Sequence, residues 1–259
     1  MNPGHAANDI SFTMSNNWFQ FKQFLVNQDN TAMKVGTDGV LLGAWAGRSD
    51  GERANRWLGL KESLRMLDIG TGTGLLALML AQRFPEALID AVELEPASFR
   101  QASQNVSQSP WPDRIQVIEA DFLRWEGRGC YHLIICNPPY FRQSLRASVE
   151  ARRLARHDDQ LPLDRLIAKS AGLLCEDGCL ALSIPHDRIN EVVALAAKSG
   201  LALSRLLRIR ATPRSAIKRV LVQLGVQSGI VESGELCIRD HAGAELSASY
   251  HELTDAFYL

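Results

Sequence analysis

The stretch RMLDIGTGTGLLALMLAQR, residues 65–83, decides the fold class of this chain. Its first five residues, RMLDI, form a short run that predicts a strand, and residues 73–83 form a longer apolar run that predicts a helix. The glycines between them, Gly70, Gly72 and Gly74, allow a tight turn in which the backbone can approach a ligand. The free N–H groups at the start of the helix would face that ligand.

Strand-like runs alternate with helical patterns from about residue 65 onward, which indicates βαβ units and a mostly parallel sheet. We predict that residues 201–209 and 218–225 pair antiparallel at the edge of this sheet. The other predicted strands are 65–69, 88–93, 115–119, 131–136 and 179–184, and the predicted helices are 73–83, 96–108, 161–175 and 186–199.

The first 60 residues follow a different pattern. Residues 18–24, WFQFKQF, alternate aromatic and polar side chains as a strand does. A loop then opens a helix for which Thr37 or Asp38 is the expected N-cap. We therefore expect residues 1–60 to form an N-terminal lid packed on one main domain, residues 61–259.

Composition places the chain among globular proteins, since 46% of its 259 residues are hydrophobic, 22% are charged and the net charge is −1. No apolar run reaches the roughly 18 residues of a membrane span, and the first residues do not resemble a signal peptide. The five cysteines form no paired CxxC sets and the histidines have no metal-ligand spacing. We expect reduced thiols, no metal and a cytoplasmic location, with a zinc site as the alternative.

Positive charge is concentrated in two windows. Residues 141–157 hold five arginines and one acid, and residues 200–230 hold six basic residues and no acid. These windows are either solvated faces or a surface for an anionic partner such as RNA.

Acidic side chains follow three successive predicted strands. Asp68 precedes Gly70, where it would repel a pyrophosphate but suit an amino-bearing ligand, and the glycines lack the G-x-G-x-x-G spacing of dinucleotide sites. Glu93 ends the second strand and could accept the hydroxyl protons of a ribose, with Glu95 as its rival. After the third strand, Asp121 could accept a proton from an adenine amino group, and Phe122 could lie against the ring. The set predicts a pocket for S-adenosyl-L-methionine.

The fourth strand ends in IICNPPYF, residues 134–141. The prolines stiffen the turn and leave two acceptors, the side-chain oxygen of Asn137 and the carbonyl oxygen of Pro138, free to bind the two N–H bonds of a planar amine. Tyr140 could stack on a flat substrate. Two such acceptors would favour a pyramidal and therefore more nucleophilic nitrogen in an amine whose lone pair is delocalised.

Residues 64–226 resemble the class I methyltransferases, which implies a Rossmann-like, mostly parallel seven-stranded sheet with an antiparallel edge strand and helices on both faces. NPPY resembles the [DNS]-P-P-[YFW] motif of enzymes that methylate adenine N6, guanine N2 or glutamine N5. Residues 21–46, the glycine turn, DAVELEP, VSQSPWPDRIQV, LIICNPPYF and the terminal LTDAFYL are similar to one bacterial family, the tRNA adenine-N6 methyltransferases that modify the adenosine 3′ of the anticodon in a valine tRNA.

That resemblance implies a tRNA substrate, bound by its anticodon stem-loop, and we expect a monomer. It implies that Lys34, Thr37 and Asp38 help to close the cofactor pocket. The substrate would meet Pro139, Tyr140, Phe141, Arg142, Arg146, Arg152, Arg153, Arg208, Arg210 and Arg214. The rival functions are a glutamine-N5 methyltransferase acting on a release factor, a guanine-N2 RNA methyltransferase, and a cofactor-binding scaffold without catalysis.

Overall fold

The computed structural model describes residues 17–29, 31, 34–47, 57, 64–138, 161–226, 229–241 and 245–258. Its strands are β1 (Trp18–Gln20), β2 (Leu25–Asn27), β3 (Arg65–Ile69), β4 (Leu88–Glu93), β5 (Ile115–Glu119), β6 (Tyr131–Cys136), β7 (Leu174–Pro185), β8 (Ala202–Arg210), β9 (Arg219–Gly225) and β10 (Glu232–Cys237). Its helices are α1 (Thr37–Trp45), α2 (Leu75–Arg83), α3 (Pro96–Ser107), α5 (Leu163–Leu173), the 3₁₀ turn η2 (His186–Arg188), α6 (Ile189–Lys198) and α7 (Ala248–Thr254).

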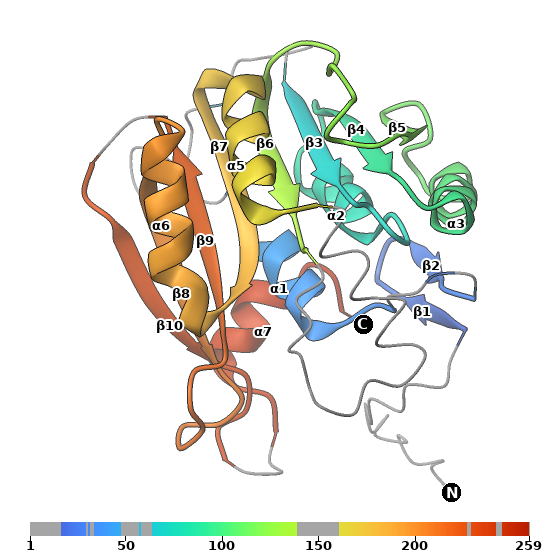
Figure 1. The fold of residues 1–259 in the computed structure, drawn as a ribbon. Coiled ribbons are helices and arrows are strands. Elements are labelled where there is room, and N and C mark those ends of the chain that lie inside the picture. Colours follow the sequence, from blue (N-terminus) through green and yellow to red (C-terminus); the bar gives the residue numbers. More distant parts are fainter. Residues whose placement is uncertain are drawn as a thin grey trace, which may run out of the picture.

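The described strands form one large sheet in the order β10-β8-β9-β7-β6-β3-β4-β5 and a separate two-stranded sheet, β1-β2 (Figure 1). All neighbours in the large sheet are parallel except β9, which runs antiparallel to β7 and to β8. The Rossmann-like α/β fold is therefore confirmed.

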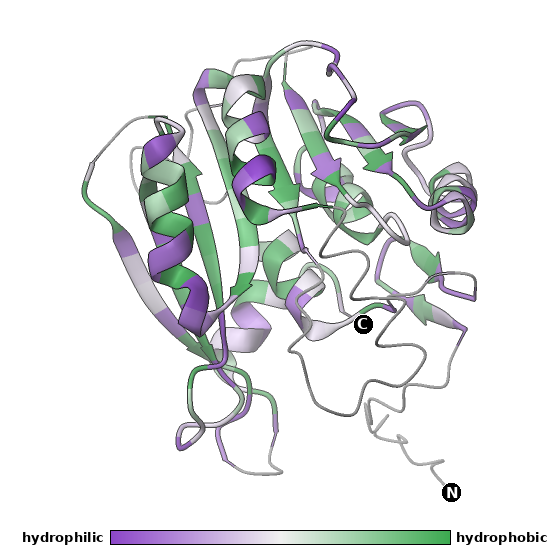
Figure 2. Ribbon diagram, in the orientation of Figure 1, coloured by the Kyte–Doolittle hydropathy of each residue, from purple (hydrophilic) through white to green (hydrophobic). Residues whose placement is uncertain are grey.

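Alternate residues of the central strands bury into two separate cores, one on each face of the sheet. In β6, Leu133 and Ile135 belong to the core that α1, α2 and α7 cover, whereas Ile134 and Cys136 belong to the core beneath α5 and α6. Figure 2 shows the hydrophobic residues concentrated on the strands and hydrophilic ones on the outward sides of α5 and α6. Because both faces are covered, the strands read as continuous apolar runs, which is why the sequence predicted them well.

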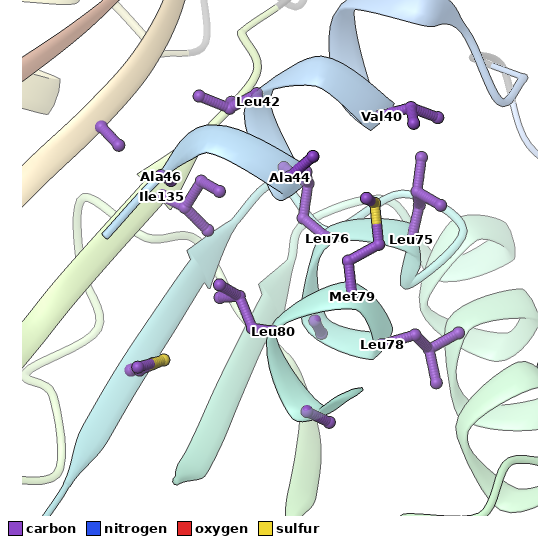
Figure 3. Close-up of a cluster of buried hydrophobic side chains, with 14 of the residues drawn as sticks. Val40, Leu42, Ala44, Ala46, Leu75, Leu76, Leu78, Met79, Leu80 and Ile135 are labelled. Carbon is purple, nitrogen blue, oxygen red and sulfur yellow. The ribbon is translucent and has the colours of Figure 1, made fainter. Parts of the chain in front are cut away.

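Helix α1 packs directly on α2 (Figure 3), so the N-terminal segment shares the core of the large sheet. Figure 3 shows Ala44 of α1 beside Leu76 of α2, and Val40 of α1 beside Leu75 of α2. The guanidinium of Arg83, at the end of α2, donates hydrogen bonds to the carbonyl oxygens of Gly43 and Ala46 at 2.6 and 2.7 Å. These bonds satisfy carbonyls that the end of α1 leaves unpaired, and they attach α1 to α2.

The N-terminal segment differs from its prediction in two respects. Residues 18–24 do not form one strand: β1 ends at Gln20, and the backbone N–H of Phe21 donates to Phe24 O at 2.9 Å, which closes a turn into β2. Neither Thr37 nor Asp38 is the N-cap of α1, because the cap is Gly36, which offers no side-chain hydrogen bond. An N-cap preference is weak beside the tertiary contacts that place a helix start.

The predicted antiparallel pair is β8 with β9, but its place at the sheet edge is wrong. Strand β10 lies outside β8, parallel to it, and brings the described part of the large sheet to eight strands. Most of β10 is exposed and only Leu236 is buried, so it carries no apolar pattern that a sequence analysis would find. Small boundary shifts also occur: α2 begins at Leu75 because Gly74 has a left-handed backbone, with φ of 84°, and α6 is preceded by η2.

The prediction that all cysteines are reduced is wrong for one pair. Cys130 and Cys175, whose Cα atoms are 4.9 Å apart, form a disulfide at the start of β6 and β7. These two residues are 45 positions apart, so only the parallel pairing of the two strands brings them together. Cys136, Cys179 and Cys237 are free thiols.

No helix in the described ranges has the length and hydrophobicity that crossing a membrane requires. Within those same ranges, no three His, Cys, Asp or Glu side chains are grouped closely enough to hold a metal ion.

Candidate functional site

The predicted cofactor-site residues that follow β3, β4, β5 and β6 lie at the carboxyl edge of these parallel strands. The arrowheads of β3, β4 and β6 in Figure 1 point to this edge, toward the side on which α1 and the β1-β2 sheet lie. Ile69 pairs with Cys136 across β3 and β6, so Gly70 and Asn137 leave their strands at the same level. Neighbouring strands are about 4.8 Å apart, which places the glycine turn beside Asn137.

The glycine turn is fixed by hydrogen bonds and leaves open space above it. The N–H groups of Gly70 and Thr71 donate to Val92 O of β4, at 2.9 and 3.2 Å. Gly70 and Gly72 have positive φ values of 66° and 59°, a conformation that side chains disfavour. A Cβ atom at Gly70 would meet nothing within 4 Å, so the turn exposes its backbone to a ligand at that point.

Asp68 is fully buried beneath this turn, with 0% of its surface exposed. Its Oδ2 atom accepts hydrogen bonds from Thr71 Oγ1 at 2.5 Å and from the N–H of Ala77, in the first turn of α2, at 3.1 Å. Its Oδ1 atom has no hydrogen-bond partner among the described residues. Burial raises the pKa of Asp68 to about 7, the two hydrogen bonds offset part of this rise, and the charge of Glu93 adds to it. A buried acceptor without a partner is costly and suits a donor supplied by a ligand.

Glu93 and Glu95 have different hydrogen-bond partners. Glu93 is 8% exposed and turns toward the glycine turn, where its two oxygens accept the N–H groups of Gly72 and Glu95 at 2.8 and 2.9 Å. The Glu95 side chain instead caps α3 by accepting the N–H of Ser98 at 2.7 Å. A carboxylate has about four acceptor positions, so Glu93 retains capacity for the hydroxyl groups of a ligand.

Asp121 and Phe122 follow β5 at the same edge of the sheet. The Asp121 side chain is 33% exposed, accepts the N–H of Leu123 at 2.9 Å and lies 3.4 Å from the Arg124 guanidinium. Phe122 is 4% exposed and belongs to the core, with Lys169 Nζ 5.4 Å from its ring centroid. Its ring therefore offers little free surface to a flat ligand.

Asn137 is half-buried and is followed by the buried Pro138. Helix α1 approaches it closely: a Cβ atom added to Gly39 would lie 3.8 Å from Asn137 Nδ2 and 3.2 Å from Leu75. The glycine at position 39 thus lets the first turn of α1 pack against the predicted catalytic side chain and the start of α2.

The first turn of α1 is held in place by an ion pair that the sequence did not suggest. Asp38 Oδ2 lies 2.8 Å from Arg219 Nε, at the first residue of β9. Asp38 therefore has a structural partner in addition to the cofactor contact predicted for it. Thr37 begins the helix, and Lys34 is half-buried just before it.

Some predicted substrate residues lie outside the described part of the chain: Pro139, Tyr140, Phe141, Arg142, Arg146, Arg152 and Arg153. Arg208 and Arg210 lie on β8 and are half-buried, and Arg214 is exposed in the connection between β8 and β9.

Asn105 of α3 is a site residue that the sequence analysis missed. It is 1% exposed, and its Nδ2 donates to the carbonyl oxygens of Asn27 and Thr73, both at 2.8 Å. Its Oδ1 accepts the N–H of Asn27 at 3.0 Å. One amide group therefore links β2 to the glycine turn. No motif marks it, because its partners lie 78 and 32 positions away.

Replacing Asn105 with leucine should lower both stability and ligand affinity. The change leaves three backbone groups without their partner, and each unsatisfied buried group costs about 1–3 kcal/mol. We expect the free energy of unfolding, measured by urea denaturation, to fall by about 3 kcal/mol or more, and calorimetry to show weaker binding of S-adenosylhomocysteine. Gln108→Ala is the matched control in the same segment, because it removes only an exposed hydrogen bond from the Asn27 side chain. Equal stability of the two variants would contradict the role given to Asn105.

Comparison with known proteins agrees with this geometry. The family model described as "Methyltransferase small domain" matches residues 56–186. The tRNA1(Val) (adenine(37)-N6)-methyltransferase of Bacteroides thetaiotaomicron is 41% identical to this chain, over 95% of this chain and 99% of its own length. The chain belongs to this family. Relatives of the same name from Pseudoalteromonas translucida and Yersinia enterocolitica are 41% and 39% identical, each over 93% of this chain and over 98% and 92% of their own lengths.

Solved structures support the fold of this family member. A predicted O-methyltransferase from Agrobacterium tumefaciens aligns with a TM-score of 0.62 at 19% identity, covering 85% of this chain and 96% of its own. A putative transferase from Pyrococcus horikoshii aligns with a TM-score of 0.55 at 14% identity, covering 80% of this chain and 70% of its own. At these identities the likeness concerns the fold alone.

Proposed function

We propose that the protein transfers the methyl group of S-adenosyl-L-methionine to N6 of the adenosine 3′ of the anticodon, position 37, in valine tRNA. The observation that carries the proposal is the position of Asn137, at the end of β6 and level with the glycine turn. An amide acceptor is thereby held beside the cradle for a methyl donor. The family relationship supplies the choice of substrate, and we propose that the enzyme acts as a cytoplasmic monomer.

The residues present fit S-adenosylmethionine. The Asp68 Oδ1 atom, buried without a partner among the described residues, suits the ligand's amino group, and the open space above Gly70 suits the methionine chain. Glu93 faces the same turn and would accept the ribose hydroxyl groups. Asp121, at the edge beyond β4, would bind the adenine amino group. When bound, this cofactor supplies an electrophilic methyl group.

The chain's own residues would prepare the target nitrogen. Adenine N6 is a poor nucleophile because its lone pair is delocalised into the ring. Asn137 Oδ1 and the carbonyl oxygen of Pro138 would accept hydrogen bonds from its two N–H groups. These bonds would favour a pyramidal nitrogen with an available lone pair. After N6 gains the methyl group, it carries a positive charge and loses one proton to water. No side chain is therefore required as a general base.

The adenine must leave its stack in the anticodon loop to reach these acceptors. Tyr140, which lies outside the described residues, would stack on the extruded base and contribute about 1–3 kcal/mol.

Nucleoside mass spectrometry tests the proposal. We expect N6-methyladenosine in valine tRNA incubated with the protein and labelled S-adenosylmethionine, and none in a matched tRNA that carries guanosine at position 37. N2-methylguanosine, or label in a release-factor glutamine in place of tRNA, would refute the assignment in favour of a rival function.

A further inference from the structure

The six basic residues between positions 200 and 230 fall into two groups. Four are engaged with neighbouring side chains: Arg205 with Glu232 at 3.0 Å, Arg208 with Ser233 at 2.8 Å, Arg210 with Glu235 at 2.5 Å and Arg219 with Asp38 at 2.8 Å. Three of these contacts join β8 to β10, and the fourth holds α1. Where the partner is a carboxylate, the positive charge is largely neutralised.

The other two, Arg214 and Lys218, are exposed in the connection between β8 and β9. Neither side chain forms an ion pair or a hydrogen bond with any residue that the structure describes. Residues 211–218 contain no acid. This connection therefore presents two uncompensated positive charges.

The connection lies at the same edge of the sheet as the candidate site. Strand β8 ends at this edge, and Arg219 at the start of β9 pairs with Pro185 at the end of β7. The carbonyl oxygen of Lys218 accepts the N–H of His186, which ties it to the segment after β7. Because β7 separates β9 from β6, Lys218 is offset from Asn137 by two strand spacings across the sheet, about 10 Å. It also lies three residues further along the strand direction, roughly 10 Å, since Cys136 pairs with Leu182 and Lys218 is level with His186.

The connection is also held in one shape. Arg210 Nη1 donates to Ser215 O at 2.5 Å, and the hydroxyl groups of Thr212 and Ser215 lie 2.6 Å apart. The N–H of Ser215 donates to Thr212 O at 3.0 Å. Arg210, which is paired with Glu235 of β10, therefore links the connection to the end of β8. A connection that is already held in one conformation loses less conformational entropy on binding a ligand than a flexible loop does.

We infer that Arg214 and Lys218 bind backbone phosphates of the RNA next to the nucleotide that is methylated, and that Arg205, Arg208, Arg210 and Arg219 serve the fold. This inference rests on the proposed function and narrows it, because Arg208 and Arg210 are removed from the predicted RNA contacts and Lys218 is added. Unpaired cations release counterions from RNA when they bind it, whereas Arg205, Arg210 and Arg219, already paired with carboxylates, release few. Arg208 keeps its charge, but its guanidinium is engaged in the hydrogen bond to Ser233.

The salt dependence of tRNA binding tests the inference. For the full-length protein, the affinity for valine tRNA is measured by fluorescence anisotropy between low and physiological salt. Each phosphate contact contributes about 0.7–0.9 to the slope of log K against log salt concentration. We expect Arg214→Gln/Lys218→Gln to reduce the slope by about 1.4–1.8, with unchanged affinity for S-adenosylhomocysteine and unchanged thermal unfolding.

The matched control is Arg208→Gln/Lys198→Gln. It removes the same net charge, but Arg208 is hydrogen-bonded to Ser233 of β10, and Lys198 lies at the end of α6, away from the carboxyl edge. We expect this control to keep the wild-type slope. The inference is overturned if the Arg214→Gln/Lys218→Gln variant keeps the wild-type slope, or if the control lowers it equally.

The two proposals fail in different ways. This inference alone is overturned if the wild-type protein forms N6-methyladenosine and the Arg214→Gln/Lys218→Gln variant keeps the wild-type salt dependence of tRNA binding. A wild-type protein that neither binds nor methylates tRNA overturns both.

Discussion

Replacing Asn137 with alanine is expected to lower kcat for tRNA methylation by about 10²–10³-fold, the usual effect of removing one preorganised hydrogen-bonding group that stabilises a transition state. The side chain lies at the end of β6, and its oxygen is proposed to accept a hydrogen bond from an N6–H group. This hydrogen bond strengthens as N6 acquires positive charge. Single-turnover kinetics with saturating tRNA and cofactor measure the effect. Calorimetry should show unchanged affinity for S-adenosylhomocysteine, because the alanine side chain leaves Asp68, Gly70 and Glu93 in place.

Asn137→Asp is the matched control for that variant. An aspartate side chain has the same length as asparagine and keeps an acceptor oxygen. The [DNS]-P-P-[YFW] motif also includes aspartate at this position. We expect the aspartate variant to retain more activity than the alanine variant. A kcat within twofold of wild type for Asn137→Ala would show that the amide is not part of the reaction, and would favour a scaffold that binds the cofactor without catalysis.

Affinity for S-adenosylhomocysteine is expected to fall about tenfold when the pH is lowered from 8 to 6, since each unit below a titrating pKa removes about tenfold of the charged form. Burial raises the pKa of Asp68 to about 7, and the ligand's ammonium group would require the ionised carboxylate. Calorimetry in two buffers of different ionisation enthalpy should detect the release of about one proton on binding at pH 6 and little at pH 8.

Asp68→Asn is the control for this pH dependence. It should bind the ligand weakly, with an affinity that no longer varies through pH 7. The same pKa has a consequence for stability without ligand. Because the folded-state value lies above the unfolded value near 3.8, Asp68 contributes stability that is present below about pH 4 and lost as the pH rises to about 7. Urea denaturation should show this decline in the wild type and a smaller one in Asp68→Asn. An affinity that is flat with pH in the wild type would contradict the proposed contact.

The sequence was sufficient to predict the central part of the fold, in which strands and helices alternate along the chain. Strands β3, β4, β5 and β6 begin and end where the sequence predicted them. The central strands β3, β4 and β6 are covered on both faces and are therefore mostly apolar, whereas the edge strand β5 is only partly buried. The antiparallel pair of β8 and β9 was also predicted correctly. Strand β10 was not, because an exposed edge strand needs apolar side chains at few positions and is defined by its hydrogen bonds to β8.

The same distinction divides the candidate site. The side chains that face the proposed cofactor, Asp68 and Glu93, lie next to strand ends, where the chain itself determines their place. Asn105 and Arg219 were missed, since each acts through a partner far away in the sequence. The disulfide between Cys130 and Cys175 was missed for the same reason.

The sequence by itself determined the chemistry, because a glycine turn after one strand and Asn-Pro-Pro-Tyr after another specify a cradle and a stiff pair of acceptors through local geometry. Only the tertiary structure decided which charges are available. Arg208 and Arg214 look alike in the sequence, yet one is hydrogen-bonded to Ser233 of β10 and the other has no partner among the described residues. The availability of a charge depends on what lies opposite it in space, and strand pairing between distant segments sets that neighbour.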